Sequence, residues 1–220
     1  MFRFSLFGFP VEVQWTFWFS AVLLSPHMNA QSGGQLYSLL LWVVIVFISI
    51  LAHELGHVLA MRFFGDRRPS ITLYAMGGLA QPTSWFSRWQ SIAVSAAGPA
   101  ASLLMGALGY ALLFIMVPDK GSKGAEVIGE WFWINIGWSI FNLLPIMPLD
   151  GGQIADSFFA KGSQRKIPIY LSLGFATAVA FYMLVSWHSY FNTLFFGMLA
   201  YNSWKRLKGL PENDFRDWGR

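Results

Sequence analysis

Long apolar stretches separated by short polar segments dominate this sequence. A helix needs about 20 predominantly apolar residues to cross the hydrocarbon core of a membrane. Six stretches reach or approach this length: residues 15–24, 36–64, 90–117, 127–146, 168–187 and 190–204. The first is the weakest, because its uninterrupted apolar run is short. The pattern predicts an all-α, polytopic membrane protein with about six transmembrane helices.

Four shorter segments have patterns of their own. Residues 70–81 begin with β-prone side chains and are then broken by two glycines, which favours a small β-hairpin or edge strand over a surface loop. Residues 1–13 alternate partly, as in a short strand or an interfacial segment. Residues 154–166 are amphipathic and end in basic residues, as in an interfacial helix and loop. Small side chains at residues 95–102 predict the close approach of another helix.

Composition agrees with a membrane protein. Hydrophobic residues make up 55% of the chain and charged residues 12%, about half the share of charged residues in a soluble domain. Residues 1–220 are therefore predicted to form one transmembrane domain. No clustered basic stripe of a nucleic-acid reader is present, despite the net charge of +4. The chain has no Cys, so a transition-metal site must use His, Asp or Glu.

The basic residues predict the orientation in the membrane. Six spans would place both termini on one side, and thirteen of the fifteen Lys and Arg residues then fall on that side. The other two are Lys120 and Lys123. Because positive residues are enriched in cytoplasmic segments, both termini are predicted to be cytoplasmic, with residues 205–220 as a cytoplasmic tail.

Three ionisable residues, His53, Glu54 and His57, lie inside the apolar stretch 36–64. On a helix the two histidines project from nearly the same face and can bind one metal ion. Glu54, about 100° further round, can reach a water molecule at that metal. Burying three such groups in lipid is energetically costly, so their presence in this stretch indicates a function. The nearby Arg62 marks a basic end of the helix, so the site is expected within the membrane towards the cytoplasmic side.

A catalytic zinc site typically has three protein ligands. Asp150 is the best acidic candidate for the third, since Pro148 and Gly151 hold it in a non-helical loop and the charge pattern puts that loop on the cytoplasmic side. Its alternative role is a helix cap or turn residue. Asn142, at the end of the fourth stretch, is a candidate to stabilise an oxyanion or orient a substrate, and capping its helix is an equal alternative.

Together these motifs resemble the site-2 protease family, whose members are intramembrane zinc metalloproteases. The resemblance covers most of residues 36–152, which would form the catalytic core, and is carried by His53-Glu54-Leu55-Gly56-His57, Gly77-Gly78, Ala97-Gly98-Pro99 and the segment from Asn142 to Gly151. It implies one Zn²⁺ bound by His53, His57 and Asp150, with Glu54 as the catalytic residue. The sequence departs from the family at Ser102, where relatives often carry Asn, and has no recognisable PDZ or CBS domain.

The expected reaction is hydrolysis of peptide bonds in or near transmembrane segments of membrane proteins, with Glu54 as general base and acid. A substrate helix must be extended before its peptide bonds can be attacked, and an exposed strand edge would help. The candidate edge is residues 73–80: Leu73, Tyr74, Ala75, Met76, Gly77, Gly78, Leu79 and Ala80. Substrate selection is expected to rest on the membrane segments or on a regulatory partner in the membrane, and the sequence does not indicate an oligomeric state.

The alternative function is a membrane zinc transporter or metal sensor. A transport path normally needs polar groups through the full depth of the membrane. Here they cluster at one end, which favours the protease.

Overall fold

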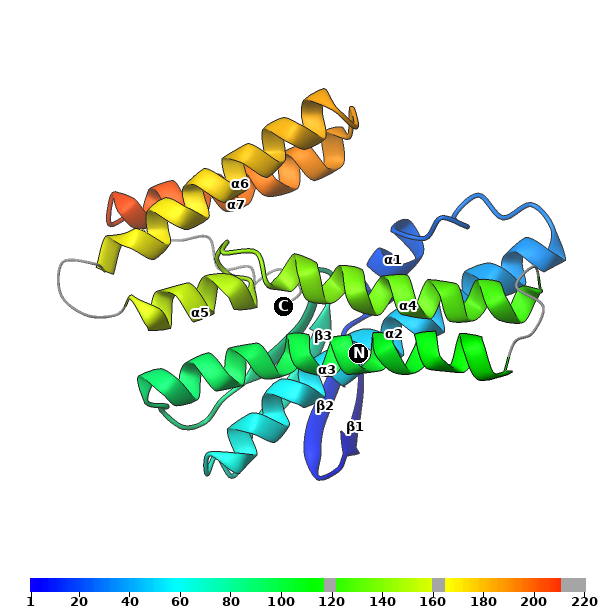
Figure 1. Cartoon of the computed structure of the whole chain (residues 1–220), viewed down its shortest axis with the longest axis horizontal. Coiled ribbons are helices and arrows are strands. Elements are labelled where there is room, and N and C mark those ends of the chain that lie inside the picture. The colour runs from blue at the N-terminus through cyan, green and yellow to red at the C-terminus, as the bar shows by residue number, and fades with distance from the viewer. Residues whose placement is uncertain (117–121, 160–164, 211–220) are drawn as a thin grey trace. The chain divides into compact units, whose positions relative to one another are not determined.

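A computed structural model describes residues 1–116, 122–159 and 165–210 of this 220-residue chain. These residues form seven helices and four strands (Figure 1). Residue 117 of the third predicted span and residues 211–220 of the predicted tail lie outside the described part of the chain.

Six of the seven described helices correspond to the predicted apolar stretches, and α5 is the exception. They are α1 (Trp15–Leu23), α2 (Gly33–Phe63), α3 (Arg88–Met116), α4 (Lys123–Asn142), α5 (Asp150–Phe158), α6 (Ile167–Val185) and α7 (Tyr190–Leu207). A capping box of Ser32 and Gln35 starts α2. The first residues assigned to the tail belong to α7, which continues to Leu207.

Three of the described helices, α2, α3 and α6, are long and apolar enough to cross a membrane. The other three predicted spans correspond to α1, α4 and α7. Helices α4 and α7 have 20 and 18 residues. Helix α1 has nine residues and is about 13 Å long, less than half the thickness of the hydrocarbon core. Length and composition thus agree with a chain that crosses a membrane more than once.

A four-stranded sheet of order β1-β2-β3-β4 accompanies the helices. Its strands are β1 (Phe2–Leu6), β2 (Phe9–Val13), β3 (Ser70–Tyr74) and β4 (Gly77–Gln81). Strands β1 and β2, and likewise β3 and β4, form antiparallel hairpins, which confirms the hairpin predicted at residues 70–81. Strands β2 and β3 pair in parallel. The fold class is therefore helical with a larger β-element than predicted.

One face of the sheet is apolar and buried. Val11 and Val13 of β2 and Ile71 and Leu73 of β3 are almost completely covered. Strand β3 packs against α1 and α2, and β4, at the edge of the sheet, packs against α2. The hydrophobic contact of this face with α2 places the edge strand beside the helix that carries the two histidines.

The connection between α4 and α5 differs from the predicted non-helical loop. Helix α4 ends at Asn142, four residues before the predicted boundary, because Pro145 and Pro148 have no N–H to continue a helix. Helix α5 begins at Asp150, after Leu149 in an extended conformation. The loop around Asp150 therefore ends one residue before the aspartate, which occupies the first turn of a helix.

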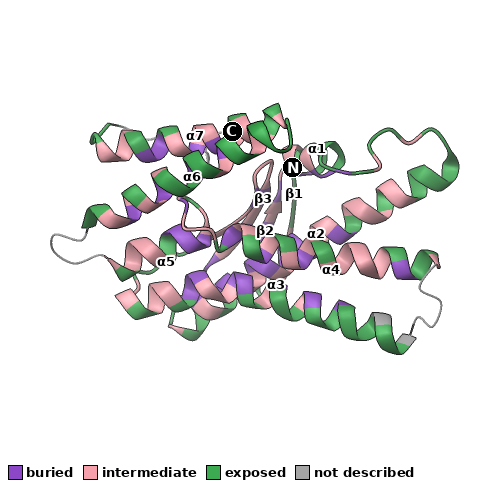
Figure 2. Ribbon diagram, turned by 45° about the horizontal axis from the view of Figure 1, so that its top comes forward, coloured by how far each residue is buried: buried purple, intermediate pink, exposed green. Residues whose placement is uncertain are grey.

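The described residues fall into two compact units. The first comprises Met1–Trp85 and Ala97–Ile140 and holds the sheet, α1 and α2. In this unit the buried residues of α2 all lie from Ile45 onward (Figure 2). The second unit comprises Phe86–Ala96 and residues 141–210 and holds α5, α6 and α7, the last two packed against each other.

Candidate metal centre

The two histidines of α2 form a preorganised pair. His53 and His57 are buried, and their Nε2 atoms lie 3.2 Å apart. Two nitrogen ligands of a tetrahedral zinc ion, each roughly 2.0 to 2.1 Å from the metal, are separated by about 3.3 Å. The pair therefore fits two positions in the coordination shell of a single ion.

Ser102 of α3 orients one of these rings. Its Oγ atom lies 3.0 Å from Nδ1 of His53, and both side chains are buried. A proton on Nδ1 that is donated to Ser102 leaves the lone pair of Nε2 free for a metal. The sequence pattern alone predicts no role for Ser102. Ser102 lies four residues after Gly98, so both residues are on the same face of α3. This spacing is the feature of the sequence that could have indicated its place beside the site.

Glycines allow α3 to pass close to the histidines. A Cβ atom at Gly98 would overlap the imidazole ring of His57. A Cβ atom at Gly56 would lie 2.5 Å from the carbonyl oxygen of Ala97 and 2.9 Å from Cβ of Ala101. The predicted close approach of a helix to residues 95–102 is thus confirmed, and the approaching helix is α2 itself.

Glu54 is buried beside the edge strand. A Cβ atom at Gly78 of β4 would overlap Cγ and Oε1 of Glu54, so the carboxylate lies directly against the backbone of this strand. Gly77 has a φ of +118°, which favours glycine, and a Cβ atom there would lie 2.7 Å from the ring of Trp138. The two glycines therefore allow the strand to lie in close contact with Glu54 and Trp138. The ring centroids of Trp138 and His53 are 6.4 Å apart.

The strand register narrows the candidate substrate edge. Leu73 lies in β3 and pairs with Val13 on one side and Gly78 on the other. Its backbone thus has two partner strands, and Leu73 is wrong as a site for pairing with substrate. Tyr74 is paired with Gly77, and residues 75 and 76 form the turn. Within the described sheet, the edge on this side is β4, residues 77–81.

Asp150 is buried in the first turn of α5. Close packing requires glycine at the next two positions, 151 and 152. A Cβ atom at Gly151 would overlap the carbonyl oxygen of Leu143, and one at Gly152 would lie 2.6 Å from the carbonyl group of Ile146. The turn that precedes α5 and the first turn of the helix therefore hold each other in place.

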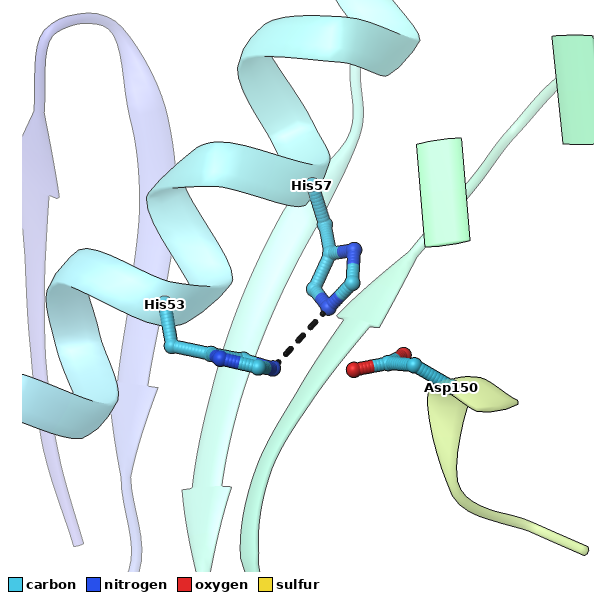
Figure 3. A group of neighbouring side chains, drawn as sticks. All are labelled: His53, His57 and Asp150. Atoms are coloured by element: carbon cyan, nitrogen blue, oxygen red, sulfur yellow. Dashed lines mark hydrogen bonds between the residues drawn. The ribbon is translucent and has the colours of Figure 1, made fainter. Parts of the chain in front are cut away.

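Ligand atoms of His53, His57 and Asp150 all lie within 4.8 Å of one another, and the three side chains point toward a common point (Figure 3). They are the candidate metal-binding group among the described residues. Two imidazoles and a carboxylate, without a thiolate, form a donor set that zinc accepts.

Two asparagines of α4 have different environments. Asn135 is fully buried and donates from Nδ2 to Oγ of Ser49 at 2.9 Å, as well as to the backbone carbonyl of Trp131. The bond to Ser49 joins α4 to α2. Asn142 is the last residue of α4 and is buried, so its position agrees with helix capping as well as with a place at the end of a site.

Asp66 is buried after the end of α2. Burial by itself would raise the pKa of this carboxyl. Hydrogen bonds from Oγ1 and the backbone N–H of Thr83, and from the backbone N–H groups of Arg68 and Ser84, stabilise the carboxylate and hold its pKa below the ordinary value. Asp66 thereby links the end of α2 to the segment before α3 and serves as a structural acid.

Family profiles match most of the chain. Residues 20–120 match the profile described as Peptidase M50B-like, and residues 122–185 match that of Peptidase family M50. A protein of Synechocystis sp., provisionally named a zinc metalloprotease, is 37% identical over 173 residues, which cover 74% of this chain and 45% of that protein. A zinc metalloprotease of Methanocaldococcus jannaschii is 24% identical, covering 90% of this chain and 54% of its own length.

The fold has a solved counterpart. The structure of the site-2 protease from Methanocaldococcus jannaschii matches with a TM-score of 0.65 and 21% identity, covering 93% of this chain and 94% of that one. The chain spans about half the length of the first two curated relatives. The motifs around His53, Asp150 and Asn142 fall within the matched ranges. The chain therefore belongs to the site-2 protease family, Peptidase family M50.

Proposed function

We propose that this protein is an intramembrane zinc metalloprotease that hydrolyses peptide bonds in or near transmembrane segments of membrane proteins. The observation that carries the proposal is the group of His53, His57 and Asp150, whose ligand atoms lie within 4.8 Å of one another in buried surroundings next in sequence to Glu54. Two relatives support the same reaction class, since one is named a zinc metalloprotease and the other is provisionally named one.

One Zn²⁺ per chain would be held by Nε2 of His53, Nε2 of His57 and a carboxylate oxygen of Asp150. The separation of the two Nε2 atoms fits one tetrahedral ion, and Ser102 leaves Nε2 of His53 available. A bound zinc ion in such a site polarises a carbonyl group and makes water more acidic. Chelation of the metal should therefore abolish cleavage.

Glu54 is the residue that moves protons. Its carboxylate takes a proton from the attacking water and later gives it to the leaving amine. Its contact with Gly78 holds the carboxylate against the edge strand, so a scissile bond that lies along β4 meets the base. Burial of Glu54 excludes bulk water from this proton transfer.

Strand β4 would bind the substrate in extended form through its backbone edge. This arrangement exposes a peptide bond that would otherwise be hydrogen-bonded inside a helix. Asn142 would orient the substrate or donate to the developing oxyanion. Both roles require only a polar side chain at the end of α4.

In the membrane, we place six helical segments, α1, α2, α3, α4, α6 and α7, with both termini in the cytoplasm and the metal centre towards that side. The excess of Lys and Arg on the terminus side supports this orientation. Because α1 is short, it needs the adjoining residues 24–32 to complete its passage.

The test uses the purified chain in detergent with a single-span membrane protein as substrate. Glu54→Gln should retain one zinc per chain and lose cleavage, because the amide cannot accept the proton. Glu126→Gln, at an exposed glutamate of α4, is the matched control and should cleave normally. Undiminished cleavage by Glu54→Gln would rule out the mechanism. Zinc flux into vesicles without any cleavage would instead favour the transporter.

A further inference from the structure

The turn between α4 and α5 has one backbone donor that the turn itself does not satisfy. Pro145 and Pro148 have no N–H, and the N–H of Ile146 donates to the carbonyl of Leu144 at 2.7 Å. The N–H of Met147 donates instead to Oγ of Ser172 on α6, at 2.9 Å. Because a backbone N–H removed from water needs a partner, α6 supplies the contact that completes this turn.

The hydroxyl of Ser172 belongs to a directed chain of hydrogen bonds. Ser203 of α7 donates to the carbonyl of Leu199 at 3.0 Å, so its own Oγ is free to accept. The Oγ atoms of Ser172 and Ser203 lie 2.7 Å apart. Ser172 thus donates to Ser203 and keeps a lone pair for Met147. Both serines are buried between two apolar helices, where a satisfied network is strong and a broken one is costly.

Close packing transmits the position of this turn to Asp150. Ile146, next to Met147, is fully buried, and its carbonyl group touches the backbone of Gly152. Gly151 in turn lies against the carbonyl of Leu143. Asp150 is covalently joined to this pair of glycines, so a shift of the turn moves the carboxylate with it.

We infer that Ser172 is a positioning residue for Asp150 and that Ser203 orients its hydroxyl. The α6–α7 pair then fixes the position of the third metal ligand, Asp150, through the hydrogen bond from the N–H of Met147 to Ser172. This role is in addition to passing through the membrane. This inference rests on the proposed function, because Asp150 is taken as a zinc ligand. It concerns residues of this chain only, all within the second unit.

The experiment measures zinc affinity of the full-length protein by competition with a chelator, and the visible spectrum of the Co²⁺-substituted protein, which reports the ligand set. Ser172→Ala should weaken zinc binding about tenfold to a hundredfold, as expected for loss of an outer contact. Ser172→Thr keeps the oxygen and should restore binding. Thr177→Val is the matched control, since Thr177 is an exposed hydroxyl of α6 that bonds to Leu173 of its own helix.

A double-mutant comparison separates positioning from general destabilisation. In an Asp150→Asn background, Ser172→Ala should cause no further loss of zinc affinity, because the ligand it positions is already gone. An equal loss in both backgrounds, or a folded Ser172→Ala variant that binds zinc like the wild type, would overturn the inference. If Ser172→Ala fails to fold, Ser203→Ala carries the test, with a severalfold loss expected and wild-type affinity contradicting it. A wild-type protein that binds no zinc would refute the proposed function instead.

Discussion

Ser102 and His53 are hydrogen-bonded across the contact of α3 with α2, with 3.0 Å between Oγ and Nδ1. This is the position at which the sequence departs from the Asn that often occurs in the family. The shorter hydroxyl still reaches the ring because small residues bring the two helices together at Gly56 and Gly98. The serine therefore still provides a hydrogen-bond partner for the His53 ring.

Removal of this hydroxyl should weaken the metal site. Ser102→Ala is expected to lower zinc affinity about tenfold to a hundredfold, since His53 loses the partner that fixes its tautomer and orientation. Chelator competition measures the change. Ser139→Ala is the control, because Ser139 is an equally buried hydroxyl that donates to the carbonyl of Pro99 and not to a proposed ligand. Equal losses in both variants would argue against a specific role of Ser102.

Gly98→Ala should displace a metal ligand by steric overlap. The new methyl group would occupy the space of the His57 ring, which must turn away or push α3 back. We expect loss of stoichiometric zinc binding and of cleavage. Gly137→Ala provides the comparison, because a Cβ atom at this helical glycine meets nothing within 4 Å. Zinc content of the purified variants, measured by elemental analysis, decides the outcome; full occupancy in Gly98→Ala would contradict the packing argument.

Gly78→Ala should separate metal binding from proton transfer. Its methyl group would overlap Glu54, which is not one of the proposed zinc ligands, so the zinc content should stay at one per chain. Cleavage should fall at least tenfold, as expected when a general base is misplaced. Single-turnover cleavage of the test substrate measures this loss. Cleavage by the variant at the wild-type rate would contradict the role of Gly78 in positioning Glu54.

Acid should weaken the fold through Asp66. Since its folded pKa is lowered, the carboxylate contributes stability above its unfolded pKa of about 3.9, and this contribution is lost as pH falls through the folded pKa. Asp66→Asn should destabilise the protein by about 1 to 3 kcal/mol at pH 7. The difference in melting temperature between the two proteins should shrink towards pH 3. A difference that is independent of pH would exclude this ionisation as its source.

The topology can be tested because the chain has no cysteine. Single cysteines at Ser5 and Lys208 should react with a membrane-impermeant thiol reagent only after cells are opened. Cysteines at the exposed residues Met28 and Trp187 should react in intact cells. This pattern follows from six membrane segments with cytoplasmic termini. Labelling of Ser5 and Lys208 positions from opposite sides would require an odd number of crossings.

Local patterns predicted most helices well. The boundaries of α2 and α6 fall within three residues of the predicted spans, because a long apolar run has few alternatives to a helix in a membrane. The boundary of α4 was predicted four residues too late, since apolar Leu143, Leu144 and Ile146 continue its pattern past the point where prolines end the helix. The sequence pattern predicts a loop at Asp150 because helix α5 starts without a capping side chain that would mark its beginning.

By itself, the sequence determined the membrane class and the pairing of His53 with His57 on one helix face, because helical spacing and the cost of buried charge act within short segments. It also offered Asp150 as the third candidate ligand, because prolines and glycines mark the segment around it. Only the tertiary structure showed that β2 pairs with β3, that Leu73 already has two strand partners and that Ser102 meets His53. These contacts join residues tens of positions apart. Their formation depends on which apolar faces pack together and on where glycines let backbones approach, and neither is encoded in any single stretch of the chain.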